Sequence, residues 1–294
     1  MGAVAGVREF DLRRAALSPA LAALYVALEW LSSFHEYKGL PFTAWDPGLG
    51  ALFAALILKP AAAVPALFFG IIAAEALALP DAIAWPRYVG VALIVTSVYA
   101  LAAAALRRLP GFDPRLPRLR DVLWLLGAGL AGAASSAVLL LALFVSIGAL
   151  GGADIAPAGW PHIVGDTIGI AIVTPLCLFV VARARQPEFA PNWRSALEIA
   201  TFAASIAIFA ALTAAAPARD NLQYFYLLFI PVMIAAVRHG LSGATLALAA
   251  TQGALVMVLD RLETGAGSFT SYQTRSEEHT SEIPSLAYLV CRLL

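Results

Sequence analysis

Long apolar stretches separated by short polar segments follow one another along almost the whole chain. A helix needs about 20 apolar residues to cross the hydrocarbon core of a bilayer, with about 17–25 as the usual range. This pattern predicts membrane-spanning helices near residues 17–34, 62–79, 88–106, 122–149, 162–182, 196–214, 223–237 and 240–259. The last two are expected to be joined by a tight turn at Arg238-His239-Gly240.

One further apolar stretch, residues 48–58, is short for a span and follows Trp45-Asp46-Pro47-Gly48. It fits either a steep crossing or a helix that enters the membrane and is buried against its neighbours. Counting it as a crossing gives about nine spans. The expected fold class is therefore all-α, a polytopic transmembrane helix bundle.

Composition supports a membrane setting. Hydrophobic residues make up 61% of the chain and charged residues 13%, against about 45–50% and about 25% in soluble domains. The formal net charge is zero, and no nucleic-acid partner is expected. The two cysteines, Cys177 and Cys291, are too few for a disulfide framework. No cleavable signal peptide is evident, so the first helix is expected to be retained as an anchor.

Lysine and arginine in the short loops predict the orientation, because cytoplasmic loops carry an excess of them. With the N-terminus inside, the inner segments hold 13 basic residues and the outer ones 4, leaving the last twenty residues aside. The inner set is Arg8, Arg13, Arg14, Lys59, Arg107, Arg108, Arg115, Arg118, Arg120, Arg183, Arg185, Arg194 and Arg238. The basic loop 107–120 could also contact anionic lipid head groups, although a role in topology alone accounts for it.

The end of the chain differs in amino-acid composition from the rest. Residues 263–269 read as a polar, Gly-rich outer loop. The segment Arg275-Ser276-Glu277-Glu278-His279-Thr280-Ser281-Glu282 then breaks with the Ala/Leu-rich pattern. It resembles the translation of a sequencing-library adapter, so residues 275–294 are predicted to be a non-native tail. An ordinary charged tail with a short amphipathic end is the alternative.

Three short motifs, in this order and spacing, carry a resemblance to a known family. The first is Thr43-Ala44-Trp45-Asp46-Pro47-Gly48-Leu49-Gly50, with Pro60 and Gly70 in the next hairpin. The second is Gly165-Asp166-Thr167-Ile168-Gly169-Ile170, followed by Thr174-Pro175-Leu176, and the third is Gly265-Ala266-Gly267-Ser268-Phe269. Together they resemble the MASE1 family of integral membrane sensory domains, found at the N-termini of bacterial histidine kinases and diguanylate cyclases or phosphodiesterases.

The resemblance implies a domain organisation. Residues 1–16 would be a cytoplasmic segment and residues 17–274 an incomplete sensory domain of the bacterial inner membrane. The family normally continues with one more helix that leads to a cytoplasmic output domain. Because nine spans from an inside start end outside, that helix and the output domain are expected to be missing from this chain.

Ionisable side chains at membrane depth are costly and therefore mark candidate functional residues. Five polar or aromatic side chains from four segments are expected near the periplasmic face: Glu29, Trp45, Asp46, Glu75 and Asp166. His162 lies one turn before the last of them. Convergence of polar groups in an apolar bundle is typical of a small-ligand pocket. These five residues are the predicted ligand-binding site.

Structural roles compete with this hypothesis at each position. Trp45 could be an interfacial anchor, like Trp85 and Trp160, and Asp46 before Pro47 fits a helix N-cap. Asp166 could cap a helix, and Glu75 could be satisfied by an interhelical hydrogen bond. The small residues of 122–149 and the pair Gly165 and Gly169 favour close helix packing. Pro175 is expected to kink its helix.

The leading functional hypothesis is a sensory input module without a catalytic centre. No HExxH, GxSxG, phosphate-binding loop, dinucleotide fingerprint, kinase ATP box or GGDEF-type motif is present. No metal or cofactor is expected. The expected partners are the lipid bilayer and a small-molecule or protein stimulus. A second copy of the chain, in a homodimer, is a further candidate partner. A small-solute transporter or channel is the alternative, and an intramembrane enzyme would need a nucleophile or metal set that the chain lacks.

Overall fold

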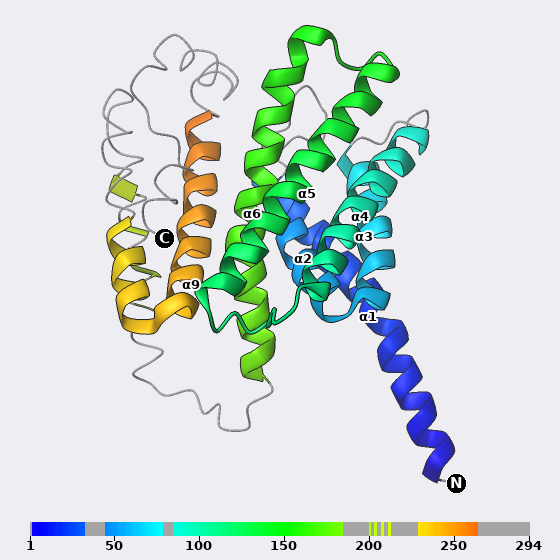
Figure 1. The fold of residues 1–294 in the computed structure, drawn as a ribbon. Coiled ribbons are helices and arrows are strands. Elements are labelled where there is room, and N and C mark those ends of the chain that lie inside the picture. The colour runs from blue at the N-terminus through cyan, green and yellow to red at the C-terminus, as the bar shows by residue number, and fades with distance from the viewer. Residues whose placement is uncertain are drawn as a thin grey trace.

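The computed structural model describes residues 2–32, 45–78, 85–184 and 229–263, with short pieces at 200, 203–204, 207–208 and 211–212. Apart from turns and one short 3-10 helix, these residues are α-helical. The helices are α1 (Gly2–Ser32), α2 (Pro47–Leu58), α3 (Pro60–Ala78), α4 (Trp85–Arg108), α5 (Leu119–Ser146), η3 (Gly152–Asp154), α6 (Ile155–Ala184) and α9 (Phe229–Glu263) (Figure 1).

The all-helical membrane fold class is confirmed within these residues. Five segments are long and apolar enough to cross a membrane: Pro60–Leu77, Trp85–Arg108, Leu119–Ser146, Gly152–Arg183 and Val232–Gly253. The count of nine spans and the inside N-terminus stay predictions. The predicted span 196–214, the Gly-rich loop after Glu263 and the segment 275–294 lie wholly or almost wholly outside the described residues.

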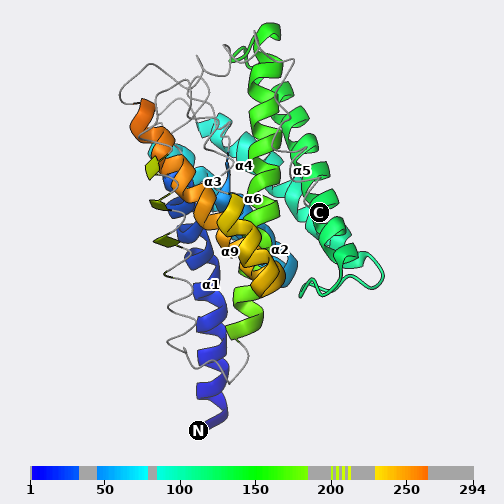
Figure 2. The same ribbon diagram turned by 90° about the vertical axis from the view of Figure 1, so that its left-hand side faces the viewer.

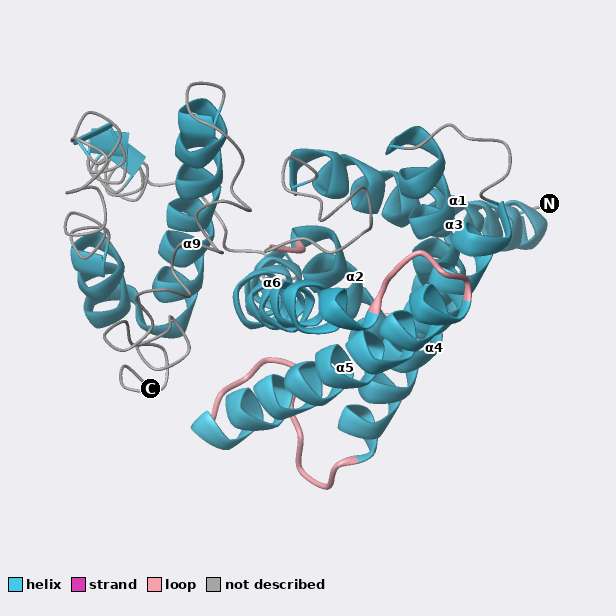
Figure 3. Cartoon of the chain, turned by 90° about the horizontal axis from the view of Figure 1, so that it is seen from above, coloured by secondary structure: helices cyan, strands magenta, loops and turns pink. Residues whose placement is uncertain are grey.

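The short helix α2 occupies the centre of the bundle. Its twelve residues extend only about 18 Å, against about 30 Å for the hydrocarbon core. Ten of the twelve are buried, because α1, α3, α4 and α6 pack around it; Figure 3 shows it from above. The burial of this stretch against its neighbours is therefore confirmed, and its crossing of the membrane stays a prediction.

Close backbone contact locks α2 against α6. The carbonyl oxygens of Asp46 and Gly169 lie where a Cβ would stand on Gly169 and Gly50 respectively, so neither glycine has room for a side chain. Thr174 Oγ1 donates a hydrogen bond to the Gly50 carbonyl at 2.7 Å. The predicted small-residue packing at Gly169 is confirmed, and its partner is α2.

Lys59, Arg107, Arg108 and Arg183 all lie at one end of the bundle, here called the arginine-rich end (Figures 1 and 2). Lys59 lies between α2 and α3, Arg107 and Arg108 end α4, and Arg183 ends α6. Helix α1 extends beyond the bundle at this end. Clustering of the basic residues at one end follows from the antiparallel order of α3, α4, α5 and α6.

Helix α9 is broken at Gly240, where φ is 62° and ψ is −149°. Glycine adopts such a positive φ without the steric cost that other residues meet. Figure 1 shows the halves on either side as two arms of a hairpin. Val232 and Ala235 of the first half pack with Ala247 of the second. The predicted turn at Arg238-His239-Gly240 is thereby confirmed.

Candidate functional site

The first turn of α2 places Asp46 inside the bundle. Its side-chain Oδ1 accepts a hydrogen bond from the Leu49 N–H at 2.6 Å, and Pro47 occupies the first helical position. The Asp46 backbone N–H donates to the Gly165 carbonyl of α6 at 3.4 Å. The N-cap role considered for Asp46 is therefore confirmed, and the same contacts bring its carboxyl group beside α6.

Asp166 connects three helices through side-chain contacts. The Tyr99 hydroxyl of α4 donates a hydrogen bond to Asp166 Oδ2, and His162 Nε2 lies 3.4 Å from the same oxygen. Ser136 Oγ of α5 lies 3.2 Å from His162 Nε2. All four side chains are buried, with Tyr99 and Ser136 fully enclosed. One continuous polar chain thus joins α4, α5 and α6.

Tyr25 of α1 is the second centre of the site. Its ring lies between two glycines, because a Cβ added at Gly48 of α2 or Gly70 of α3 would stand 3.1 Å from a ring carbon. The carboxyl groups of Glu29, Asp46, Glu75 and Asp166 all lie within electrostatic range of the Tyr25 hydroxyl.

Side-chain contacts link the acids to one another as well. The Glu29 and Asp46 carboxyl groups lie close enough to interact, and Asp46 also interacts electrostatically with Asp166 and His162. Below, the polar cluster means these groups together: Tyr25, Glu29, Trp45, Asp46, Glu75, Tyr99, Ser136, His162 and Asp166.

The structure therefore brings together four of the five predicted residues around Tyr25. Trp45, the fifth, precedes Asp46 and is only 7% exposed, whereas Trp85 and Trp160 are 53% and 62% exposed. Exposed tryptophans near helix ends fit the interfacial-anchor interpretation. Trp45 does not fit it, because its side chain is enclosed by the bundle.

The predicted depth needs a correction on α6. The helix was expected to begin near residue 162, but it begins at Ile155. Asp166 consequently lies about three turns, roughly 16 Å, from the first residue of α6 rather than near the N-terminus of the helix. Glu29 and Glu75 do lie within one turn of the ends of α1 and α3. The cluster thus continues from these helix ends into the interior of the bundle.

Tyr25, Tyr99 and Ser136 were not predicted as members of the cluster, and His162 was predicted only as a neighbour of Asp166. A signal for the tyrosines exists, because a buried tyrosine hydroxyl usually finds a hydrogen-bond partner. Gly132 is a second signal for Tyr99: a Cβ there would stand 2.8 Å from Tyr99 Cε1, so the ring packs closely against α5.

Ser136, His162 and Asp166 have the residue types of a catalytic triad but a different geometry. In a triad the serine and the aspartate contact opposite nitrogens of the imidazole. Here both contact Nε2, so the histidine cannot pass a proton between them in that manner. Within the described residues, no three His, Cys, Asp or Glu side chains are arranged to hold a metal ion.

Comparison with known proteins supplies a family. The family model MASE1 matches residues 16–288, and the match extends past residue 274, where the sequence prediction ended the domain. No curated protein matches the chain. No solved structure matches it either. MASE1 is a family of membrane sensory input domains rather than catalytic ones. The match covers most of the chain and agrees with its membrane-type helices, so the chain belongs to the MASE1 family.

Proposed function

We propose that this chain is the membrane-embedded input module of a bacterial signal-transduction protein of the inner membrane. In this proposal the N-terminus and the arginine-rich end face the cytoplasm. A stimulus acts on the polar cluster, and the helix bundle passes the change to a cytoplasmic output domain outside this sequence. The ligand-binding residues are Glu29, Trp45, Asp46, Glu75 and Asp166.

The observation that supports the proposal is that six helices meet in one buried polar cluster. Tyr25, Asp46 and Asp166 belong to α1, α2 and α6, and their side chains interact. A ligand shifts a conformational equilibrium only as far as it binds two states unequally. Groups that join six helices would change their contacts whenever these helices move. A ligand bound to these groups would therefore have different affinities for the two states. Carboxyl oxygens accept hydrogen bonds, so the proposal favours a stimulus with donors or positive charge.

The test uses a full-length relative with an output domain, carrying replacements at the positions of Asp166 and Glu75. Asp166→Asn and Glu75→Gln keep the shape of each side chain and remove its capacity for negative charge. We expect the signalling output to change several-fold while insertion into the membrane, measured by fractionation, stays the same. The matched control is Asp113→Asn in the α4–α5 loop, where the side chain accepts a hydrogen bond from the nearby Arg115 N–H. Output unchanged in both cluster variants contradicts the proposal.

One observation favours the alternative of a small-solute transporter. Helix α2 begins inside the bundle beside Asp46 and Asp166, and transporters place such short, discontinuous helices at their binding sites. A flux assay in proteoliposomes separates the two functions. Solute flux that Asp166→Asn abolishes would support transport, whereas a responsive output domain without flux supports the sensor.

A further inference from the structure

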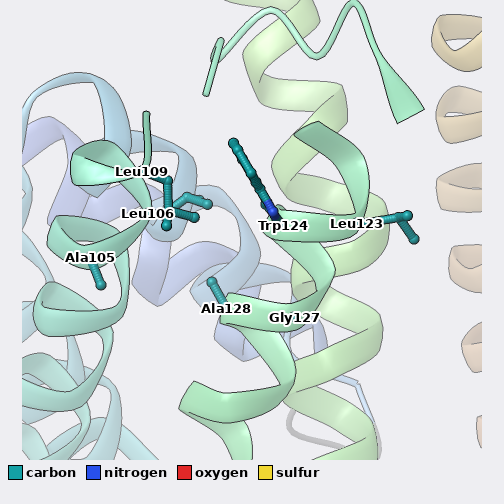
Figure 4. A pocket seen from close by; sticks show the side chains of 7 residues that line it. All are labelled: Ala105, Leu106, Leu109, Leu123, Trp124, Gly127 and Ala128. Atoms are coloured by element: carbon teal, nitrogen blue, oxygen red, sulfur yellow. The ribbon is translucent and has the colours of Figure 1, made fainter. Parts of the chain in front are cut away.

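A groove at the arginine-rich end lies between α4 and α5, away from the polar cluster. It encloses about 280 Å³ and is lined by Ala105, Leu106, Leu109, Leu123, Trp124, Gly127 and Ala128. Figure 4 shows Leu106 and Leu109 of α4 pointing toward the Trp124 ring of α5. None of these seven residues carries a charged side chain, so the groove itself suits hydrocarbon.

Small residues keep this groove open. A Cβ added at Gly127 meets no atom within 4 Å in the described part of the chain. By contrast, a Cβ at Gly132, further along α5, would stand 2.8 Å from Tyr99. The two helices are therefore in close contact at Tyr99 and leave space between them at Gly127.

Arginines stand close in the chain to the residues that line the groove. Arg107 and Arg108 lie in the last turn of α4, and Arg118 and Arg120 lie at the start of α5; all four are exposed. Arg120 is held in place, because it donates to the Gly111 carbonyl at 3.0 Å and lies 4.6 Å over the Trp124 ring. A guanidinium group recognises phosphate through paired hydrogen bonds.

An apolar groove between two helix ends that carry exposed arginines matches a molecule with a hydrocarbon chain and an anionic head. We infer that the α4–α5 groove binds an anionic phospholipid of the leaflet at the arginine-rich end. One acyl chain lies over Trp124 and Gly127, and the phosphate contacts Arg108 and Arg118. Charge complementarity selects this occupant over a neutral lipid, and basic segments beside membrane helices attract anionic lipids for the same reason.

The test uses the full chain in lipid nanodiscs and the fluorescence of Trp124. Brominated acyl chains quench tryptophan on contact, and subtracting the signal of Trp124→Phe isolates this residue from the other five tryptophans. Nanodiscs contain either brominated phosphatidylglycerol or brominated phosphatidylcholine at the same mole fraction in unbrominated phosphatidylcholine. We expect at least twofold stronger quenching of Trp124 by the anionic lipid.

Two pairs of variants sharpen the result. Arg108→Gln with Arg118→Gln should remove the preference for the anionic lipid, whereas Lys59→Gln, between α2 and α3, should keep it. Gly127→Leu should fill the groove and abolish quenching of Trp124. Gly253→Leu, whose added Cβ also meets no described atom, should leave it intact. Equal quenching by both lipids, no quenching by either, or a preference that survives loss of the two arginines overturns the inference.

Discussion

Helices α4 and α5 meet in different ways at two levels of the bundle. Around Tyr99 and Gly132 they are in close contact, and the Tyr99 hydroxyl and Ser136 extend that contact to α6 through Asp166 and His162. Around Leu109 and Gly127 the same helices enclose a groove lined with hydrocarbon. Buried polar side chains connect the helices at the first level, whereas uncharged side chains line the groove at the second.

This difference shows what an apolar helix sequence leaves undetermined. In lipid the hydrophobic effect does not drive helices together, so close packing and interhelical hydrogen bonds decide where they meet. Glycine allows close packing only where a neighbour supplies a side chain to fill the space. Gly132 meets Tyr99 and Gly127 meets no described atom, although they lie five residues apart on one helix. The following predictions test that contrast.

The largest effect is expected from Gly132→Leu. A Cβ there would stand 2.8 Å from Tyr99 Cε1, and the hydrogen bond to Asp166 holds the ring in place. Overpacking of this kind typically costs about 1–3 kcal/mol, and we expect the upper end. The free energy of unfolding in mixed micelles, titrated with a denaturing detergent, measures it. A change below about 0.5 kcal/mol, the usual size for a surface substitution, would mean that the ring is free to move.

A smaller effect is expected for the hydrogen bond between Tyr99 and Asp166. Asp166→Ala leaves the fully buried Tyr99 hydroxyl without its acceptor, which should cost about 1–3 kcal/mol. Tyr99→Phe removes the donor instead. The double variant should then be less destabilised than the sum of the two single variants, with a coupling of about 1 kcal/mol. Strict additivity in this double-mutant cycle would show that the two groups contribute independently.

Thr174→Val tests the bond that fastens α6 to α2. Its hydroxyl donates to the Gly50 carbonyl at 2.7 Å, and interhelical bonds in membranes average about 0.6 kcal/mol. Thr251→Val is the matched control, because Thr251 donates at 2.8 Å to Ala247 within its own helix. The difference between the two variants in unfolding free energy reports the interhelical contribution. Equal losses of unfolding free energy in the two variants would show that the α2–α6 hydrogen bond contributes no more than a bond within one helix.

The smallest effect on stability is expected for Gly127→Leu. Its side chain would enter the groove without meeting a described atom, and substitutions at such open positions usually change stability by less than about 0.5 kcal/mol. Comparing the unfolding free energies of Gly127→Leu and Gly132→Leu in the same titration contrasts the groove directly with the close contact at Tyr99. A loss as large as that of Gly132→Leu would mean that the helices close over the groove.

Sequence reasoning located most helices because hydrophobic length sets them directly. It placed α3 and α4 within a few residues, and it placed the turn at Gly240. It began α6 seven residues late: Pro157 lies in the first turn, where a helix tolerates proline, whereas Pro161 lies inside the helix. It also began the first helix near residue 17, whereas α1 begins at Gly2, because hydropathy does not register a helix that continues beyond the apolar region.

The candidate site was only partly predictable. Four acids are visible in the sequence because charge inside an apolar stretch is rare. Tyr25 and Tyr99 were missed because a tyrosine in such a stretch looks like any other large packing residue. Their positions depend on which glycines face them: Gly48 and Gly70 for Tyr25, and Gly132 for Tyr99. Those pairings come from helix register across the bundle, which one sequence does not contain.

The short length of α2 has an electrostatic consequence. Its peptide dipoles sum to about half a positive elementary charge at the first turn, and that turn lies in the bundle interior, beside Asp46 and near Asp166. The residues of this turn are buried, so bulk water screens the field only weakly. The negative charge around the N-terminus of α2 therefore stabilises the position of this helix in the bundle. Neutralising that charge by a proton or a cation would loosen the helix from its N-terminal end.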